Sequence, residues 1–127
     1  MSDTMNSEHA RDRRQRFGAQ RGRDLYWGFM IGFFVNAATM FMISLGGDIP
    51  ELAITSAVVG VFIFVCVNSF DCMDDFKANS QDMGDEEQAT NLGKKFLEAP
   101  WLMFKTLVVL IFGAMTVCQL HEMWDIF

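Results

Sequence analysis

Three long apolar segments alternate with polar segments along this chain of 127 residues. The apolar segments cover residues 25–46, 51–70 and 100–120. A helix of about 20 residues, rising about 1.5 Å per residue, spans the roughly 30 Å hydrocarbon layer of a bilayer. These segments are apolar on every side, and the remaining chain is too short to bury them in a soluble fold. We therefore expect an all-α membrane protein with three transmembrane helices.

The two connections between the apolar segments differ in length. Gly46, Gly47 and Pro50 stand between the first and second segments, and these residue types commonly end one helix and begin the next. So short a connection predicts that the first two helices form an antiparallel hairpin. By contrast, residues 71–99 form a long acidic loop before the third helix.

That loop carries the signature of a further helix at about 85–98. Asp85 is the expected N-cap, Gln88 follows three residues later, and Lys94 and Lys95 stand in the last turn. Apolar residues share one stripe of the segment, which predicts a short amphipathic helix on the inner membrane surface, leading into the third transmembrane helix. Gly93 weakens this prediction because glycine lowers helix propensity.

The distribution of cations predicts the orientation. All ten Lys and Arg residues lie before the first helix, in the second loop or one turn into the third helix. Because cations are retained on the cytoplasmic side, we expect the N-terminus in the cytoplasm or matrix and the C-terminus outside, in a bacterial or organelle inner membrane. Residues 1–24 are interpreted as an Arg-rich polar tail, and residues 121–127 as a short outer tail.

Small and polar residues recur at helical spacing within the apolar segments. Gly28, Gly32 and Asn36 share a face of the first helix, and Ser56 and Gly60 repeat the spacing in the second. In lipid, helices associate through close backbone approach and interhelical hydrogen bonds, so these faces are expected helix-packing interfaces. The neighbour is either another helix of this chain or another subunit. The surplus of phenylalanine in the first two helices favours another subunit, because three short helices cannot bury all of these rings against one another.

Residues typical of membrane–water interfaces flank the spans. Trp27 and Trp101 are expected at the inner interface and Trp124 at the outer one. Lys105 lies one turn into the third helix and should extend its ammonium back to the inner surface.

The inner side of the protein combines a basic tail with an acidic loop. We expect the tail to fold over the loop, or a partner to dock there, through two sets of residues of opposite charge: Arg11, Arg13, Arg14 and Arg16 in the tail, and Asp74, Asp75, Asp85 and Glu86 in the loop. Clustered carboxylates also suit Mg²⁺ or Ca²⁺, but the alternating acids of a calcium loop are absent, and we predict no metal site.

The layout, with Asn68-Ser69 followed by acids at the inner end of the second helix, resembles the small prokaryotic diacylglycerol kinases. The resemblance covers the topology and this one dipeptide. Those enzymes carry glutamates three residues before and four residues after the asparagine, where this sequence has Val65 and Cys72. Without these carboxylates, the sequence offers neither the metal ligands nor the general base that phosphoryl transfer needs.

These observations favour a non-catalytic accessory subunit of a larger membrane complex, such as a respiratory or photosynthetic assembly, acting by helix packing. A holin-like or channel-forming homo-oligomer is the alternative, and a small membrane enzyme of lipid metabolism comes third. We expect other membrane subunits and the lipid bilayer as partners, and no nucleic acid. No catalytic residue and no cofactor is predicted, and the sequence is compatible with a bound lipid or pigment.

Overall fold

The fold is all-helical in a computed structural model that describes residues 7–125, and no strand occurs among these residues. Three of the helices are long and apolar enough to cross a membrane, as the sequence predicts. The helices are α2 (Glu8–Leu45), α3 (Glu51–Gln81), α4 (Asp85–Gln88), α5 (Asn91–Leu97) and α6 (Trp101–Trp124).

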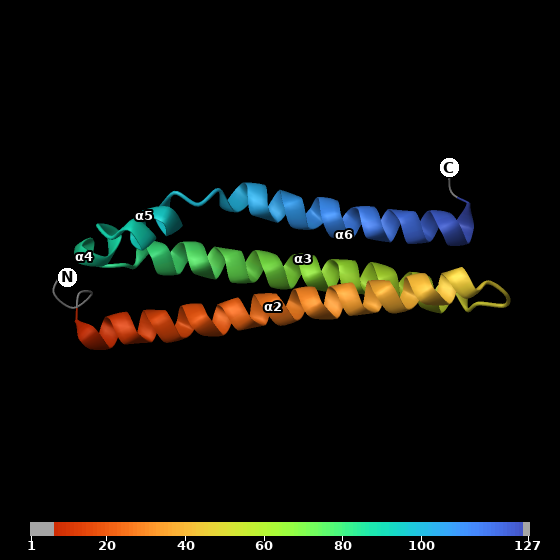
Figure 1. Cartoon of the computed structure of the whole chain (residues 1–127), viewed down its shortest axis with the longest axis horizontal. Helices are drawn as coiled ribbons and strands as arrows, with labels where there is room; N and C mark the ends of the chain where they lie inside the picture. The colour runs from red at the N-terminus through yellow and green to blue at the C-terminus, as the bar shows by residue number, and fades with distance from the viewer. Residues whose placement is uncertain (1–6, 126–127) are drawn as a thin grey trace.

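The three long helices lie side by side along the long axis of the molecule, and α4 and α5 gather at the end where α2 begins (Figure 1). α3 packs against both α2 and α6, and residues 46–50 join α2 to α3. The largest buried cluster joins α3 to α6 and is formed by Val61, Val65, Met73, Val108 and Phe112. Aliphatic side chains and one ring therefore hold α6 on the rest of the bundle.

Helix α2 begins much earlier than the sequence analysis expects. The polar tail proposed for residues 1–24 is helical from Glu8 onward and continues into the apolar segment without a break. Ser7 caps this helix by accepting a hydrogen bond from the Ala10 amide over 3.3 Å. Packing against α3 supplies the stability that an isolated polar helix lacks, since Gly18 and Gly22 bring the backbone close to Asn79 and Phe76. Residues 1–6 lie outside the described part of the chain.

The acidic loop is also more helical than expected at its start and less continuous at its end. α3 runs through residues 71–81, and the single helix expected at about 85–98 is divided into α4 and α5. Thr90 starts the second of these, because its hydroxyl accepts the Gly93 amide over 3.0 Å. Gly84, rather than Asp85, occupies the N-cap position of α4.

The helix ends opposite α4 and α5 are closed by glycines and by one tryptophan (Figure 1). Gly46 and Gly47 have φ values of 64° and 88°, which few other residues adopt, and Pro50 precedes α3. α6 extends beyond the expected end at Leu120 to Trp124, whose indole N–H donates to the Thr55 hydroxyl over 2.9 Å. Residues 121–124 are thus helix rather than tail, and residues 126–127 lie outside the described part.

Candidate functional site

A buried polar cluster joins α2 to α6 within their apolar segments. The Gln119 side-chain amide donates to Oδ1 of Asn36 over 2.7 Å, and the Thr39 hydroxyl donates to Oε1 of Gln119. Asn36 also donates to the carbonyl of Gly32, one turn earlier, over 2.8 Å. Both amide side chains are almost fully buried, at 1% and 2% exposure. The side chains therefore satisfy one another where an unpaired polar group would be costly.

The small-residue face of α2 packs inside this chain. A Cβ atom on Gly28 would lie 2.1 Å from Nδ2 of Asn68, and one on Gly32 would lie 2.6 Å from both Phe112 and Val65. Asn68 in turn donates to the carbonyl of Asp24 over 3.3 Å. Of the two neighbours considered for this face, the structure therefore brings α3 and α6 of the same chain against it.

The corresponding face of α3 points outward. Ser56 is exposed and donates to the carbonyl of Leu52 over 2.8 Å, and a Cβ atom on Gly60 would meet no heavy atom within 4 Å. A shallow hollow of about 530 Å³ surrounds Gly60, and the side chains of Phe64 and Val67 form part of its lining. The expected interface residues thus divide between a buried α2 face and an open α3 face.

The helical segments outside the apolar bundle are residues 8–24 of α2, residues 71–81 of α3, α4 and α5. We call them the inner head, after the side of the membrane on which the distribution of cations leads us to expect them. Arg21 is its central cation: Nη2 lies 3.2 Å from Oδ2 of Asp71 and is also paired with Asp75. Partial desolvation lowers the pKa of Arg21, but the Asp75 and Asp71 carboxylates outweigh this effect and raise it. Arg21 therefore joins α2 to α3 as a permanent charge.

A second contact joins α2 to α4. The Arg14 guanidinium pairs with Glu87, and the carbonyl of Arg14 accepts the Asn79 side-chain amide over 3.3 Å. Arg14 and Arg21 are seven residues apart, so they lie on the same face of α2, two turns from each other. That spacing is visible in the sequence but does not single out this pair, since Arg16 and Arg23 are also seven residues apart. The role of Glu87 could not be read from any spacing either.

Other residues assigned to the head have different surroundings. Asp75 pairs with Arg21, and Asp74 accepts a hydrogen bond from Lys105 over 2.6 Å. The remaining five assigned residues make no ion pair within residues 7–125: Arg11, Arg13, Arg16, Asp85 and Glu86. Arg11 is half-buried and the other four are exposed.

The residues expected at the membrane interface differ in how far they are buried. Trp27 is exposed on α2, and the Lys105 ammonium lies 5.4 Å from the centroid of the Phe70 ring. Trp101, however, is half-buried and stacks with Phe76 at 6.1 Å and with Phe96 at 6.4 Å between ring centroids. Trp101 therefore joins the start of α6 to the inner head.

Among residues 7–125, no group of three or more His, Cys, Asp or Glu side chains is arranged to hold a metal ion. The structure instead brings together a polar cluster between α2 and α6 and an ion-paired inner head. Comparison with protein-family models, with curated proteins and with solved structures finds no match to this chain.

Proposed function

We propose that the protein is a non-catalytic accessory subunit of a larger membrane complex, anchored by its three apolar helices, with its inner head on the cytoplasmic or matrix side. In this arrangement α2 and α3 form an antiparallel transmembrane hairpin, and α6 crosses the membrane once more to place the C-terminus outside. The cations before Leu25 support the orientation, because arginines near a span are retained on the inner side.

The observation that carries this proposal is the ion-paired inner head. In α2, roughly 17 residues precede Leu25, so at about 1.5 Å per residue the helix reaches about 25 Å beyond its apolar segment. Arg14 and Arg21 tie this extension to Glu87 and Asp71, and Lys105 ties the start of α6 to Asp74. A chain that builds an ordered, charged head on a membrane anchor is suited to hold neighbouring subunits.

The interior of the anchor also supports a structural role. Asn36, Thr39 and Gln119 donate to one another or to nearby carbonyls, so they do not line a polar surface of the bundle. A channel would need such polar side chains to face water. We further propose that α5, whose Leu97 is exposed, carries the chain back to the inner membrane surface before α6.

The test is to extract the tagged protein from its native membrane in mild detergent, size the particle and identify its components by mass spectrometry. Co-migration with a fixed set of other proteins supports the proposal. A particle made of this chain alone, together with dye leakage from liposomes containing the purified protein, would overturn it in favour of the holin-like alternative.

A further inference from the structure

We propose that the outer face of α2 in one copy docks onto the outer face of α3 in a second copy, with a row of aromatic and basic side chains meeting the Gly60 hollow and the carboxylates below it. This self-association goes beyond the proposed function and does not rest on it, because it needs no other subunit.

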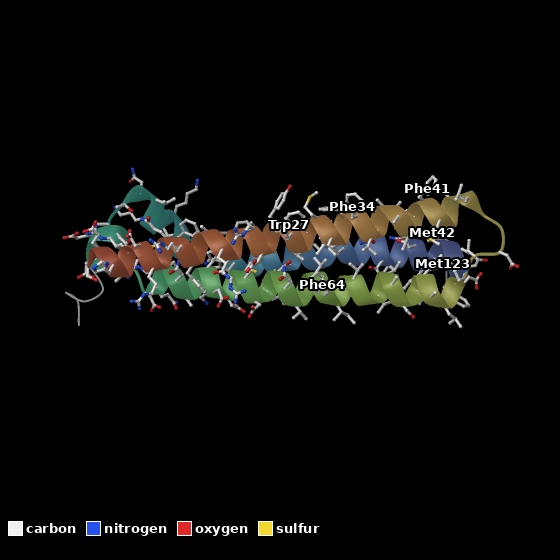
Figure 2. The ribbon with its side chains drawn as sticks, turned by 90° about the horizontal axis from the view of Figure 1, so that it is seen from below. Trp27, Phe34, Phe41, Met42, Phe64 and Met123 are labelled. Atoms are coloured by element: carbon white, nitrogen blue, oxygen red, sulfur yellow. The ribbon has the colours of Figure 1, made fainter. Side chains whose placement is uncertain are left out.

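The outer face of α2 is one continuous row. Arg16, Arg23, Trp27, Phe34 and Phe41 are spaced by seven, four, seven and seven residues, which keeps them on one side of a helix. Phe34 and Phe41 are 74% and 63% exposed. Figure 2 shows both on the side of α2 that is turned away from α3. The row is basic in the inner head and aromatic through the apolar segment.

The outer face of α3 offers an open glycine in the apolar segment and carboxylates near the inner head. Gly60 leaves open space in the apolar segment, and Val67 continues the same face toward the inner end. Asp71 and Asp74 then follow on this face, with side chains 64% and 62% exposed although each has one intrachain partner. Gly60 thus leaves space for a ring of α2 within a lining that also includes Ile63, Phe64 and Val67, and carboxylates stand at the level of the Arg23 guanidinium group.

The membrane fixes the register between two copies, because both must lie at the same depth. Within one chain, Gly28 of α2 is level with Asn68 of α3, and Gly32 is level with Val65. Moving five residues toward the N-terminus from Gly28 brings Arg23 level with the turn that holds Asp71 and Asp74. Moving two residues outward from Gly32 brings Phe34 level with Ile63, which lines the same hollow as Gly60.

Charge complementarity points to a second copy as the occupant of these faces. Arg16 and Arg23 make no ion pair within the described residues. Arg23 is level with Asp71 and Asp74, whose side chains stay 64% and 62% exposed, so a neighbouring α3 offers it carboxylates at the same depth.

The contact is heterologous, since a different face is used on each side, and this property makes it testable. One variant, Phe34→Ala with Arg23→Glu, blocks only the α2 face. A second variant, Gly60→Leu, fills only the α3 hollow, at a position where an added Cβ meets no heavy atom of its own chain within 4 Å. Each purified variant is reconstituted alone, and then mixed with the other, at low density in liposomes of neutral phospholipid. Association is measured by energy transfer between copies labelled at the outer terminus.

The wild-type chain is expected to associate, each variant alone to lose association by about tenfold or more, and the mixture to regain it as pairs. The matched controls are Leu110→Ala and Ala114→Leu on the exposed face of α6, which should leave association unchanged. Unchanged association in either variant, or no recovery in the mixture, would overturn the proposal. Association of wild type only when other membrane proteins are added would also overturn it, while leaving the subunit function intact.

Discussion

The side-chain amide of Gln119 donates to Oδ1 of Asn36 over 2.7 Å, which ties α6 to α2 inside the apolar bundle. Because Asn36 uses its own amide to donate to the Gly32 carbonyl, its acceptor oxygen is left for Gln119. The two helices are thereby joined by a directional contact that adds to the close packing of Gly32 against Phe112.

Removing this contact should destabilise the bundle by a small, measurable amount. For Asn36→Leu and Gln119→Leu, a double-mutant cycle of unfolding free energies in mixed micelles should give a coupling of about 0.5 to 1.5 kcal/mol, the range found for hydrogen bonds between membrane helices. Each single variant leaves one buried amide without its hydrogen-bond partner, whereas the double variant leaves none. The loss of stability in the double variant should therefore be smaller than the sum of the two single losses. A coupling near zero would show that the two side chains act independently.

Replacement by alanine should have different effects on stability at Gly32 and at Gly60, although the sequence predicts both as helix-packing residues. Gly32→Ala places a methyl group 2.6 Å from Phe112 and Val65, and overpacking of this kind costs about 1 to 3 kcal/mol. Gly60→Ala meets open space and should be neutral, or stabilising by up to about 1 kcal/mol through helix propensity. The measurement is the midpoint of denaturation in detergent for both variants. Equal effects would contradict the assignment of buried and open faces.

The division between these two glycines also shows what the sequence could predict. Hydropathy predicts the three membrane-length helices, because about 20 apolar residues in succession have few other uses. The same pattern does not say which small-residue face meets a helix, since Gly32 and Gly60 have the same local context of bulky apolar neighbours. Only the packing of Phe112 from α6 distinguishes them, and that contact depends on a residue far away in sequence.

The inner head was harder to predict for a related reason. Residues 8–24 have no apolar stripe, so periodicity gives no helix signal for them. Their helical structure depends on ion pairs with α3 and α4, such as Arg14 with Glu87 and Arg21 with Asp75. Opposite charges in the tail and the loop suggested a contact in general, but the loop partner at Glu87 became visible only once the helices were in place.

Replacing Arg21 should open the inner head. Arg21→Gln removes the cation that ties α2 to Asp71 and Asp75, and leaves these two carboxylates unneutralised four residues apart on α3. Chymotrypsin should therefore cleave at Leu92 and Phe96 several-fold faster in this variant, since head opening exposes the backbone. Arg13→Gln is the matched control, because Arg13 is exposed and pairs with no acid in residues 7–125. Equal cleavage rates would contradict a structural role for Arg21.

Gly93 should be essential to the fold of the head even though it lowers helix propensity. A Cβ atom at this position would lie 2.1 Å from the carbonyl oxygen of Glu87, and a backbone group cannot move aside as a side chain can. Gly93→Ala is expected to separate α5 from α4, at a cost of about 1 to 3 kcal/mol, and to raise hydrogen exchange at the α4 amides. The control is Ala89→Gly, which exchanges the same two residue types at an exposed site nearby. Unchanged exchange in Gly93→Ala would rule out the close approach.

Trp27 and Trp101 should report different surroundings although both mark the inner end of the apolar segments. Trp27 is 58% exposed on α2, whereas Trp101 stacks against Phe76 and Phe96. The proteins to compare keep one of these two tryptophans, with the others replaced by phenylalanine, and carry Gly60→Leu so that copies stay apart. Lipids brominated near the headgroup should then quench Trp27 strongly and Trp101 weakly, because bromine quenches on contact. Phe76→Ala removes one stacked ring and should increase the quenching of Trp101 without affecting Trp27. Equal quenching of both tryptophans would place Trp101 at the lipid surface and remove the link between α6 and the inner head.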